Sequence, residues 1–305
     1  MSTLNEKDKI YLTALVSSNS FGPVTLNYLR KHFNSFFDLY SSNYNKLYQL
    51  GIKDNIINKF LSFRKSNKFC KILDKIKEEK IKVIFKGDDF FPKLMREIHN
   101  CPLLLFALGN IKILNNKCLT TVGSRIFTYY GQKITRNLIK ETDNKICIVS
   151  GLAKGIDAIA HTTALETNKK TIAIFGCGLN SSSVYPKENY NLYQQIIERG
   201  SLIISEFPPF TPPLKSNFPR RNRLLAAISK ATLIIEAKNK SGALITANLA
   251  LDFNRDVLAV PKNIDDKYFQ ATNFLIKSGA TPILTYNDIN DYFNIDKLEK
   301  KYTLN

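Results

Sequence analysis

Three arginines stand within four positions in the stretch FPRRNRLLAAIS. Arg220, Arg221 and Arg223 span about one helical turn, so their side chains fan out and cannot all share one face. Guanidinium groups match phosphate geometry well, and we expect at least one of the three to bind phosphate. Another can instead reach inward and form an ion pair with an acid such as Glu206 or Glu236.

The aromatic residue that opens this stretch has two interpretations. Phe218 can stack on an unpaired base, which stabilises binding by roughly 1–3 kcal/mol per base. It can equally pack into the core beneath the loop. The sequence leaves both possibilities open.

Small residues and cations also follow several apolar stretches that look like strands. CLTTV is followed by Gly123, Ser124 and Arg125, and ICIV is followed by SGLAKG, which contains Lys154. TLIIE is followed by AKNKSG. Small residues let a backbone approach an anion, and the N-terminus of a following helix favours negative charge. Several phosphate sites along one rim suit a nucleic-acid strand better than one small phosphate.

Other chemistries fit these motifs less well. GCGLNS lacks the third glycine of a dinucleotide-binding loop, and SGLAKGID lacks the order of a nucleotide triphosphatase loop. Asp157 and His161 are four residues apart and share a helix face. They could form a general base and the residue that orients it, with Ser124 as the nucleophile. Without a GxSxG elbow, we favour a structural hydrogen bond between Asp157 and His161.

Strands and helices alternate from about residue 116 onward. The candidate strands are 118–122, 146–149, 171–175, 201–205, 232–236, 256–260 and 282–286. The helical segments between them are 128–142, 155–167, 189–199, 224–229, 243–254 and 271–279. Nearly continuous apolar strands joined by helices predict an α/β fold, a doubly wound and mainly parallel sheet of Rossmann-like type. Ligands of such sheets bind beyond the carboxyl ends of the strands, where the motifs above lie.

The N-terminal part has a different pattern. Residues 1–80 show apolar positions at helical spacing, which predicts a small all-helical module. The segment FGPVTLNYLRKHF loosely fits a helix–hairpin–helix or SAM-like element; the alternative is a bundle that only packs. We therefore divide the chain into the module 1–80, a connecting region 81–115, a Rossmann-like DNA-binding domain 116–296 and a short tail 297–305.

Composition narrows the class of protein. The chain of 305 residues is 44% hydrophobic and carries a net charge of +18, which favours polyanionic partners. Its abundance of Lys, Asn and Ile offers coding bias as another source of the lysine excess. No apolar run approaches the roughly 20 residues of a membrane helix, and the N-terminus lacks a signal core. Five dispersed cysteines without a CxxC pair predict no metal site and no disulfide framework. We expect a cytoplasmic protein without a cofactor or membrane partner.

Taken together and in order, these motifs resemble the DNA-processing protein A (DprA/Smf) family. The resemblance rests on GSR, SGLAKGIDAIAH, GCGL, YP, SEFPP, FPRRNRLLAAIS, EAKNKSGALITA, AVP and QATNFLIKSGA. It is strong over about 110–285 and weak over the N-terminal helices. KGDDFFPKLMREIHNCPLLLFALGN is similar to the family's lead-in to the sheet.

The resemblance implies a recombination mediator and not an enzyme. Such proteins bind and protect single-stranded DNA, load the RecA recombinase, act in natural transformation and usually form homodimers. By motif, the DNA-binding residues are Gly123, Ser124, Arg125, Ser150, Gly151, Lys154, Lys215, Phe218, Arg220, Arg221, Asn222, Arg223, Ser241 and Gly242. Among them, the lysines are extra phosphate contacts and the small residues allow close backbone approach.

This chain departs from the family pattern at a few positions. Ala226 and Ala227 stand where the family often has a glycine, and Lys262 follows Pro261 where a glycine is usual. Many members carry a C-terminal winged helix, and the short remainder after about residue 296 predicts that it is absent here.

Two rival functions remain. One is a Rossmann-like enzyme of the nucleoside-monophosphate phosphoribohydrolase type, although the comparable loop, KNKSGALITA, has no catalytic acid. The other is a scaffold that acts only through protein partners.

Overall fold

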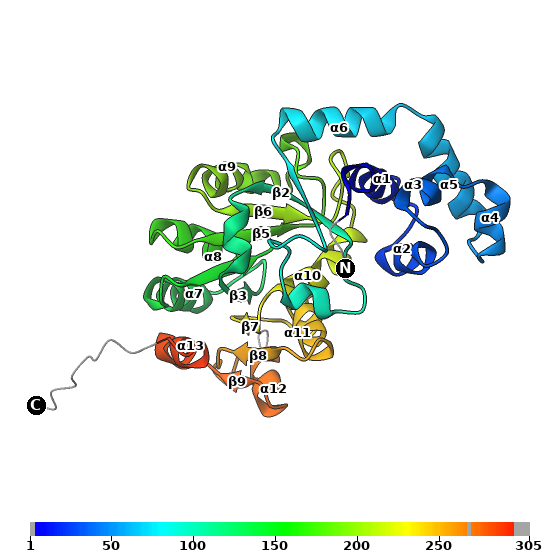
Figure 1. Ribbon diagram of the computed structural model, residues 1–305. Helices are drawn as coiled ribbons and strands as arrows, with labels where there is room; N and C mark the ends of the chain where they lie inside the picture. The colour runs from blue at the N-terminus through cyan, green and yellow to red at the C-terminus, as the bar shows by residue number, and fades with distance from the viewer. Residues whose placement is uncertain (1–3, 267–269, 296–305) are drawn as a thin grey trace, which may run out of the picture.

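The structure, a computed structural model, describes residues 4–266 and 270–295 (Figure 1). Its centre is a nine-stranded sheet with the strand order β1-β2-β6-β5-β4-β3-β7-β8-β9. The strands are β1 Lys82–Phe85, β2 Leu104–Gly109, β3 Lys117–Val122, β4 Ile146–Ser150, β5 Thr171–Phe175, β6 Leu202–Ser205, β7 Ala231–Ile234, β8 Asp256–Ala259 and β9 Thr281–Pro282. The strands from β6 to β9 in this order are parallel, which confirms the predicted fold class.

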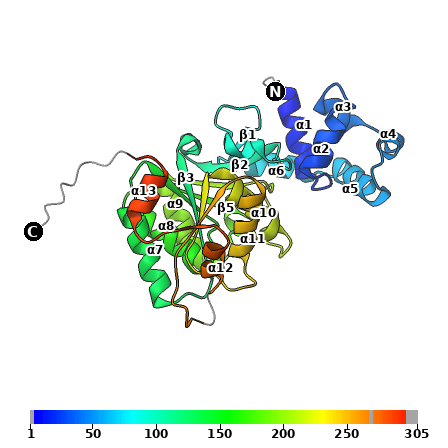
Figure 2. The same ribbon diagram turned by 90° about the horizontal axis from the view of Figure 1, so that it is seen from below.

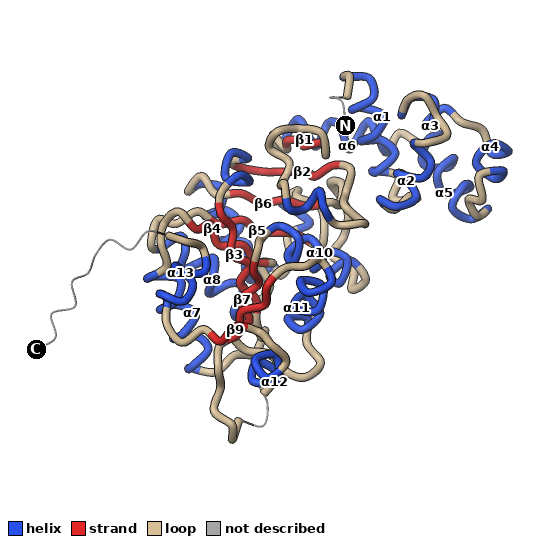
Figure 3. The backbone as a smooth tube through the Cα atoms, turned by 60° about the horizontal axis from the view of Figure 1, so that its bottom comes forward, coloured by secondary structure: helices blue, strands red, loops and turns tan. Residues whose placement is uncertain are grey.

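Helices cover both faces of the sheet (Figures 1 and 3). The helices of one face are α7 Tyr129–Glu141, α8 Ile156–Glu166, α9 Tyr190–Glu198 and α13 Tyr286–Tyr292. Those of the other are α10 Asn217–Ile228, α11 Gly242–Asp252 and α12 Ala271–Lys277. The strands β4, β5 and β6 lie on one side of β3 and the strands β7, β8 and β9 on the other, so the topological switch point lies between β3 and β7. Loops meet there at the carboxyl ends of strands, where a doubly wound sheet binds ligands.

Residues 81–115, predicted as a connecting region, form part of the sheet. β1 and β2 pair with each other and β2 pairs with β6, both antiparallel, so this segment forms one edge of the sheet. Two short 3₁₀ helices, η1 Leu94–Glu97 and η2 Ile111–Asn115, complete it. The sequence did not predict this edge, because antiparallel strands need no long helices between them.

The N-terminal helices lie beside this edge, as Figure 2 also shows. They are α1 Glu6–Ser17, α2 Pro23–Arg30, α3 Phe36–Ser41, α4 Tyr44–Gln49, α5 Asp54–Lys65 and α6 Lys68–Glu78. Leu12 of α1, Leu26 of α2 and Phe60 of α5 share one hydrophobic cluster with Phe106 of β2 and Phe175 of β5. The module therefore packs against the same core as the sheet.

Three local features differ from the sequence prediction. α10 begins seven residues before the predicted 224–229 helix, because Pro219 is tolerated in a first helical turn. The strand predicted at 282–286 is short, since Thr285 and Asp288 form a capping box that starts α13. The predicted tail 297–305 lies outside the described residues, among which no helix is long and apolar enough to cross a membrane.

Candidate nucleic-acid interface

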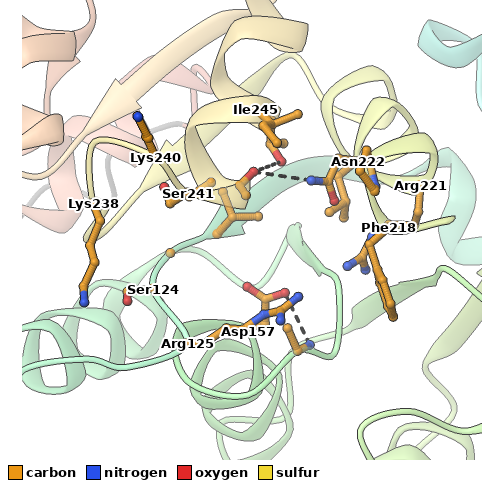
Figure 4. Close-up of a pocket in the computed structure, with 18 of the residues that line it drawn as sticks. Ser124, Arg125, Asp157, Phe218, Arg221, Asn222, Lys238, Lys240, Ser241 and Ile245 are labelled. Carbon is orange, nitrogen blue, oxygen red and sulfur yellow. Dashed lines mark hydrogen bonds between the residues drawn. The ribbon is translucent and has the colours of Figure 1, made fainter. Parts of the chain in front are cut away.

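A cavity of about 560 Å³ opens at the switch point of the sheet. Loops after β3 and β7 and the first turns of α10 and α11 form its walls. Figure 4 shows Phe218, Arg221 and Asn222 of α10 facing Arg125 and Asp157, with Lys238 and Lys240 on another side. We call this cavity the switch-point pocket.

Nine of the fourteen predicted site residues line the switch-point pocket. They are Gly123, Ser124, Arg125, Lys215, Phe218, Arg221, Asn222, Ser241 and Gly242. Gly151 and Lys154 line a smaller hollow of about 40 Å³ that shares Arg125, Phe218 and Arg221 with the pocket. Motifs spread over 120 residues of sequence thus converge on one place.

Arg125 and Arg221 contribute in different ways. The Arg125 side chain is exposed at the rim, where a phosphate can reach it. Arg221 is only 4% exposed, and its guanidinium donates hydrogen bonds to the carbonyl oxygens of Gly151 and Ile174. Burial lowers the pKa of Arg221, and the nearby carboxylate of Asp157 opposes that shift. Arg221 therefore holds the pocket floor together and presents only part of its charge to a ligand.

Three predicted site residues lie outside both cavities. Arg223 points away from them and forms a buried ion pair with Glu206, which is the inward ion pair that the sequence left open. The exposed Arg220 guanidinium lies 5.0 Å from the centre of the Phe207 ring, beside the N-terminal helices. Ser150 is buried, and its hydroxyl donates to the carbonyl of Thr121 at 2.7 Å. We still predict a DNA contact for Arg220 alone of these three.

The aromatic wall of the pocket comes from two chain segments. Phe218 is half-buried and packs on Gly176, where a Cβ would lie only 3.0 Å from the ring. Tyr185 lies 5.6 Å from Phe218 between ring centres, tilted by 47°. Phe218 therefore has one side against Gly176 and another facing the pocket, and base stacking on it stays a prediction.

Our site prediction missed Lys238, Lys240 and Tyr185. Both lysines are exposed and line the switch-point pocket from the loop after β7. The KNKSG sequence contains both lysines beside the predicted Ser241 and Gly242, so their signal was present. Tyr185 belongs to the YP motif, but its place at the pocket depends on how the 181–189 segment folds over it.

The catalytic alternative involving Ser124 finds no support in these contacts. One oxygen of the Asp157 carboxylate accepts the backbone N–H groups of Gly151 and Ala153, at 3.1 and 3.4 Å. His161 Nδ1 lies 2.7 Å from Thr171 Oγ1 and not near Ser124, whose hydroxyl bonds to Ile126. The predicted hydrogen bond between Asp157 and His161 was therefore wrong, because each side chain bonds to other groups. Burial raises the pKa of Asp157 and lowers that of His161 to about 3, so His161 is neutral.

The comparison with known protein families decides the identity. A family model described as DNA recombination-mediator protein A matches residues 82–294. This chain belongs to the DNA recombination-mediator protein A family.

Relatives within the family, called DprA or Smf, are similar over most of the chain. DNA processing protein DprA of Streptococcus pneumoniae is 41% identical over 202 residues, which is 66% of this chain and 71% of the relative. Protein Smf of a Synechocystis species is 34% identical over 288 residues, or 92% of this chain and 72% of the relative.

Solved DprA structures match the architecture as well. The S. pneumoniae DprA crystal structure superposes with a TM-score of 0.77 at 30% identity, covering 97% of this chain and all of that one. A Helicobacter pylori DprA structure, described for its mode of single-stranded DNA binding, gives 0.63 at 28% identity. It covers 70% of this chain and 96% of that chain.

The lysine that follows the AVP motif is part of a buried network beside the pocket. Lys262 Nζ forms a buried ion pair of 2.6 Å with Glu236. The Glu236 carboxylate also accepts the backbone N–H of Thr128 at 3.0 Å and the Thr128 hydroxyl. Since Thr128 caps α7, Glu236 joins the loop after β3 to the loop after β7. These two loops carry Arg125 and Lys238 into the switch-point pocket.

Proposed function

We propose that this protein binds single-stranded DNA in the switch-point pocket and does not cut it. The observation that carries the proposal is the set of cations around the pocket mouth. Arg125, Lys215, Lys238 and Lys240 come from three separate loops and surround one cavity. Small residues between them, such as Gly123 and Gly242, let a sugar–phosphate chain come close to the backbone.

The aromatic wall supports an unpaired strand over a duplex. Phe218 and Tyr185 both face the pocket, and a base can stack on such a ring only when it has left its partner strand. Stacking does not depend on base identity, because every base has a π-face. We therefore expect binding with little sequence preference.

Family membership supports the cellular role that we propose. As a DprA-type protein in the cytoplasm, this chain protects incoming strands and loads RecA onto them during natural transformation, acting as a homodimer. A recombinase-loading assay tests this directly. Adding the protein to a strand coated with single-strand-binding protein should shorten the lag before RecA filaments form.

Fluorescence anisotropy with a labelled oligo-dT strand tests the DNA site. Arg125→Glu should weaken binding at least tenfold, since it removes one phosphate contact and adds repulsion. The slope of log K against log salt should also fall by about 0.7 for the lost contact. Arg136 is an exposed arginine on α7 outside both cavities, so Arg136→Glu is a control with the same change of charge.

Equal affinities of the Arg125→Glu and Arg136→Glu variants would contradict the assignment of the pocket. Incubation with nucleoside monophosphates covers the enzymatic rival, for which release of free base would be the positive result. The Arg221→Glu variant is a poor test, because a carboxylate there would replace a buried group that bonds to two carbonyls.

A further inference from the structure

A small hollow lies beside the switch-point pocket and adds Gly151, Lys154 and Pro186 to the wall that the two share. It is lined by Arg125, Gly151, Ala153, Lys154, Tyr185, Pro186, Phe218 and Arg221. Arg125, Phe218, Arg221, Ala153 and Tyr185 also line the switch-point pocket, so the two cavities are continuous along one wall. A strand leaving the pocket on this side meets the hollow next.

Tyr185 is placed to receive a base there. Its side chain is 45% exposed although its neighbours Val184 and Pro186 are buried. The amide of Asn189 donates to the carbonyls of Leu152 and Ala153, at 2.9 and 3.2 Å, and so ties this segment to the loop after β4. An exposed ring on an anchored segment loses little freedom when a base stacks on it.

The size of the hollow decides how a nucleotide would bind. About 40 Å³ is close to the space of a single water molecule, which takes roughly 30 Å³ in the liquid. A nucleobase therefore does not enter the hollow whole. It can lie across the mouth, with one face on the exposed side of the Tyr185 ring.

A lysine that can bind phosphate lies at the same place. Lys154 forms an ion pair with Glu188 at 2.5 Å, with side chains 54% and 63% exposed. Exposed pairs of this kind contribute little to stability, so a strand phosphate can replace the Glu188 carboxylate. Lys154 is a predicted phosphate contact that lines the hollow but not the switch-point pocket.

We propose that the hollow is a second nucleotide subsite, in which the base next to the one in the switch-point pocket stacks on Tyr185 while its phosphate binds Lys154. This inference rests on the proposed single-strand function. It assigns base stacking to Tyr185 and a path to the DNA strand, which passes from the pocket over the 185–189 segment.

The test compares strands with and without bases. On labelled oligo-dT, Tyr185→Ala should weaken binding about tenfold, as expected for one lost stacking contact, and Tyr185→Phe should keep wild-type affinity. Neither should change the salt slope, whereas Lys154→Ala should lower it by about 0.7. Tyr48→Ala removes an exposed tyrosine of α4, far from the pocket, and should leave affinity unchanged.

An abasic strand of equal length separates stacking from other effects. Wild type and Tyr185→Ala should bind it with the same affinity, because there is no base to stack. Equal affinity of the two proteins for oligo-dT would overturn the subsite, and so would an undiminished tenfold loss on the abasic strand. Failure of the wild type to bind any strand would instead refute the proposed function, and the subsite with it.

Discussion

The Arg223→Ala variant tests whether the arginine cluster divides into binding and structural members. Arg223 and Glu206 are 7% and 6% exposed and pair with each other between α10 and the end of β6. Glu206 already has one buried oxygen with no hydrogen-bond partner in the described structure. Removing Arg223 would leave the whole carboxylate buried without its counter-charge.

The expected loss follows from that burial. Breaking a buried ion pair by deleting one partner costs about 3–5 kcal/mol of unfolding free energy, a large part of the stability of an ordinary domain. The loss should depend on pH. Burial raises the pKa of Glu206 and Arg223 opposes this, so the variant should have a still higher folded-state pKa. A carboxyl group whose pKa is raised in the folded state destabilises the fold at pH values above that pKa. The lost stability returns as the pH falls from there toward the ordinary pKa of the carboxyl group in the unfolded chain. The deficit should thus be largest near pH 7–8 and smaller near pH 5.

Urea denaturation at fixed protein concentration measures this loss at both pH values. The control is Arg136→Ala, an exposed arginine on α7, which should change stability by about 0.5 kcal/mol or less. At urea concentrations where the Arg223→Ala variant is still folded, it should bind oligo-dT with the affinity of the wild type. If Arg223→Ala kept its unfolding free energy within about 1 kcal/mol of the wild type but lost DNA affinity, Arg223 would be a binding residue and not a structural one.

Two further predictions concern buried contacts near the site. Gly131→Ala should lower the unfolding free energy by about 1–3 kcal/mol although alanine favours helix, because the new Cβ would overlap the Glu236 carboxylate that Lys262 and Thr128 hold in place. Chemical denaturation measures this loss, with Gly242→Ala as the control, since a Cβ at Gly242 meets only Asn222 at 3.8 Å. Equal stabilities of the two variants would contradict the tight fit at Gly131. His161, with its pKa lowered to about 3, takes up a proton only in the unfolded chain as pH falls below about 6.5, so acidification from pH 7.5 to 5 should cost about 2 kcal/mol through this residue. His161→Gln should remove that part of the pH dependence, and an unchanged pH profile in the variant would argue against a buried neutral imidazole.

The sequence by itself determined the parallel sheet and most of the pocket. Apolar strands spaced by helices can bury both faces of a sheet in few ways, and the carboxyl ends of parallel strands then meet at one edge. That geometry brings Gly123, Arg125, Ser241 and Gly242 together whatever the details of packing. Phe218 and, through the family resemblance, Lys215 were also predicted, and both lie in the same place.

Only the tertiary structure decided which way each side chain of α10 points. Successive helical residues turn by about 100°, so the sequence shows that Arg220, Arg221 and Arg223 diverge but not which one faces the core. That depends on how α10 is rotated against the sheet, where Glu206 receives Arg223 and the carbonyls of Gly151 and Ile174 receive Arg221. The place of Tyr185 at the pocket wall and the antiparallel edge formed by β1 and β2 likewise come from contacts between distant segments, which no local pattern encodes.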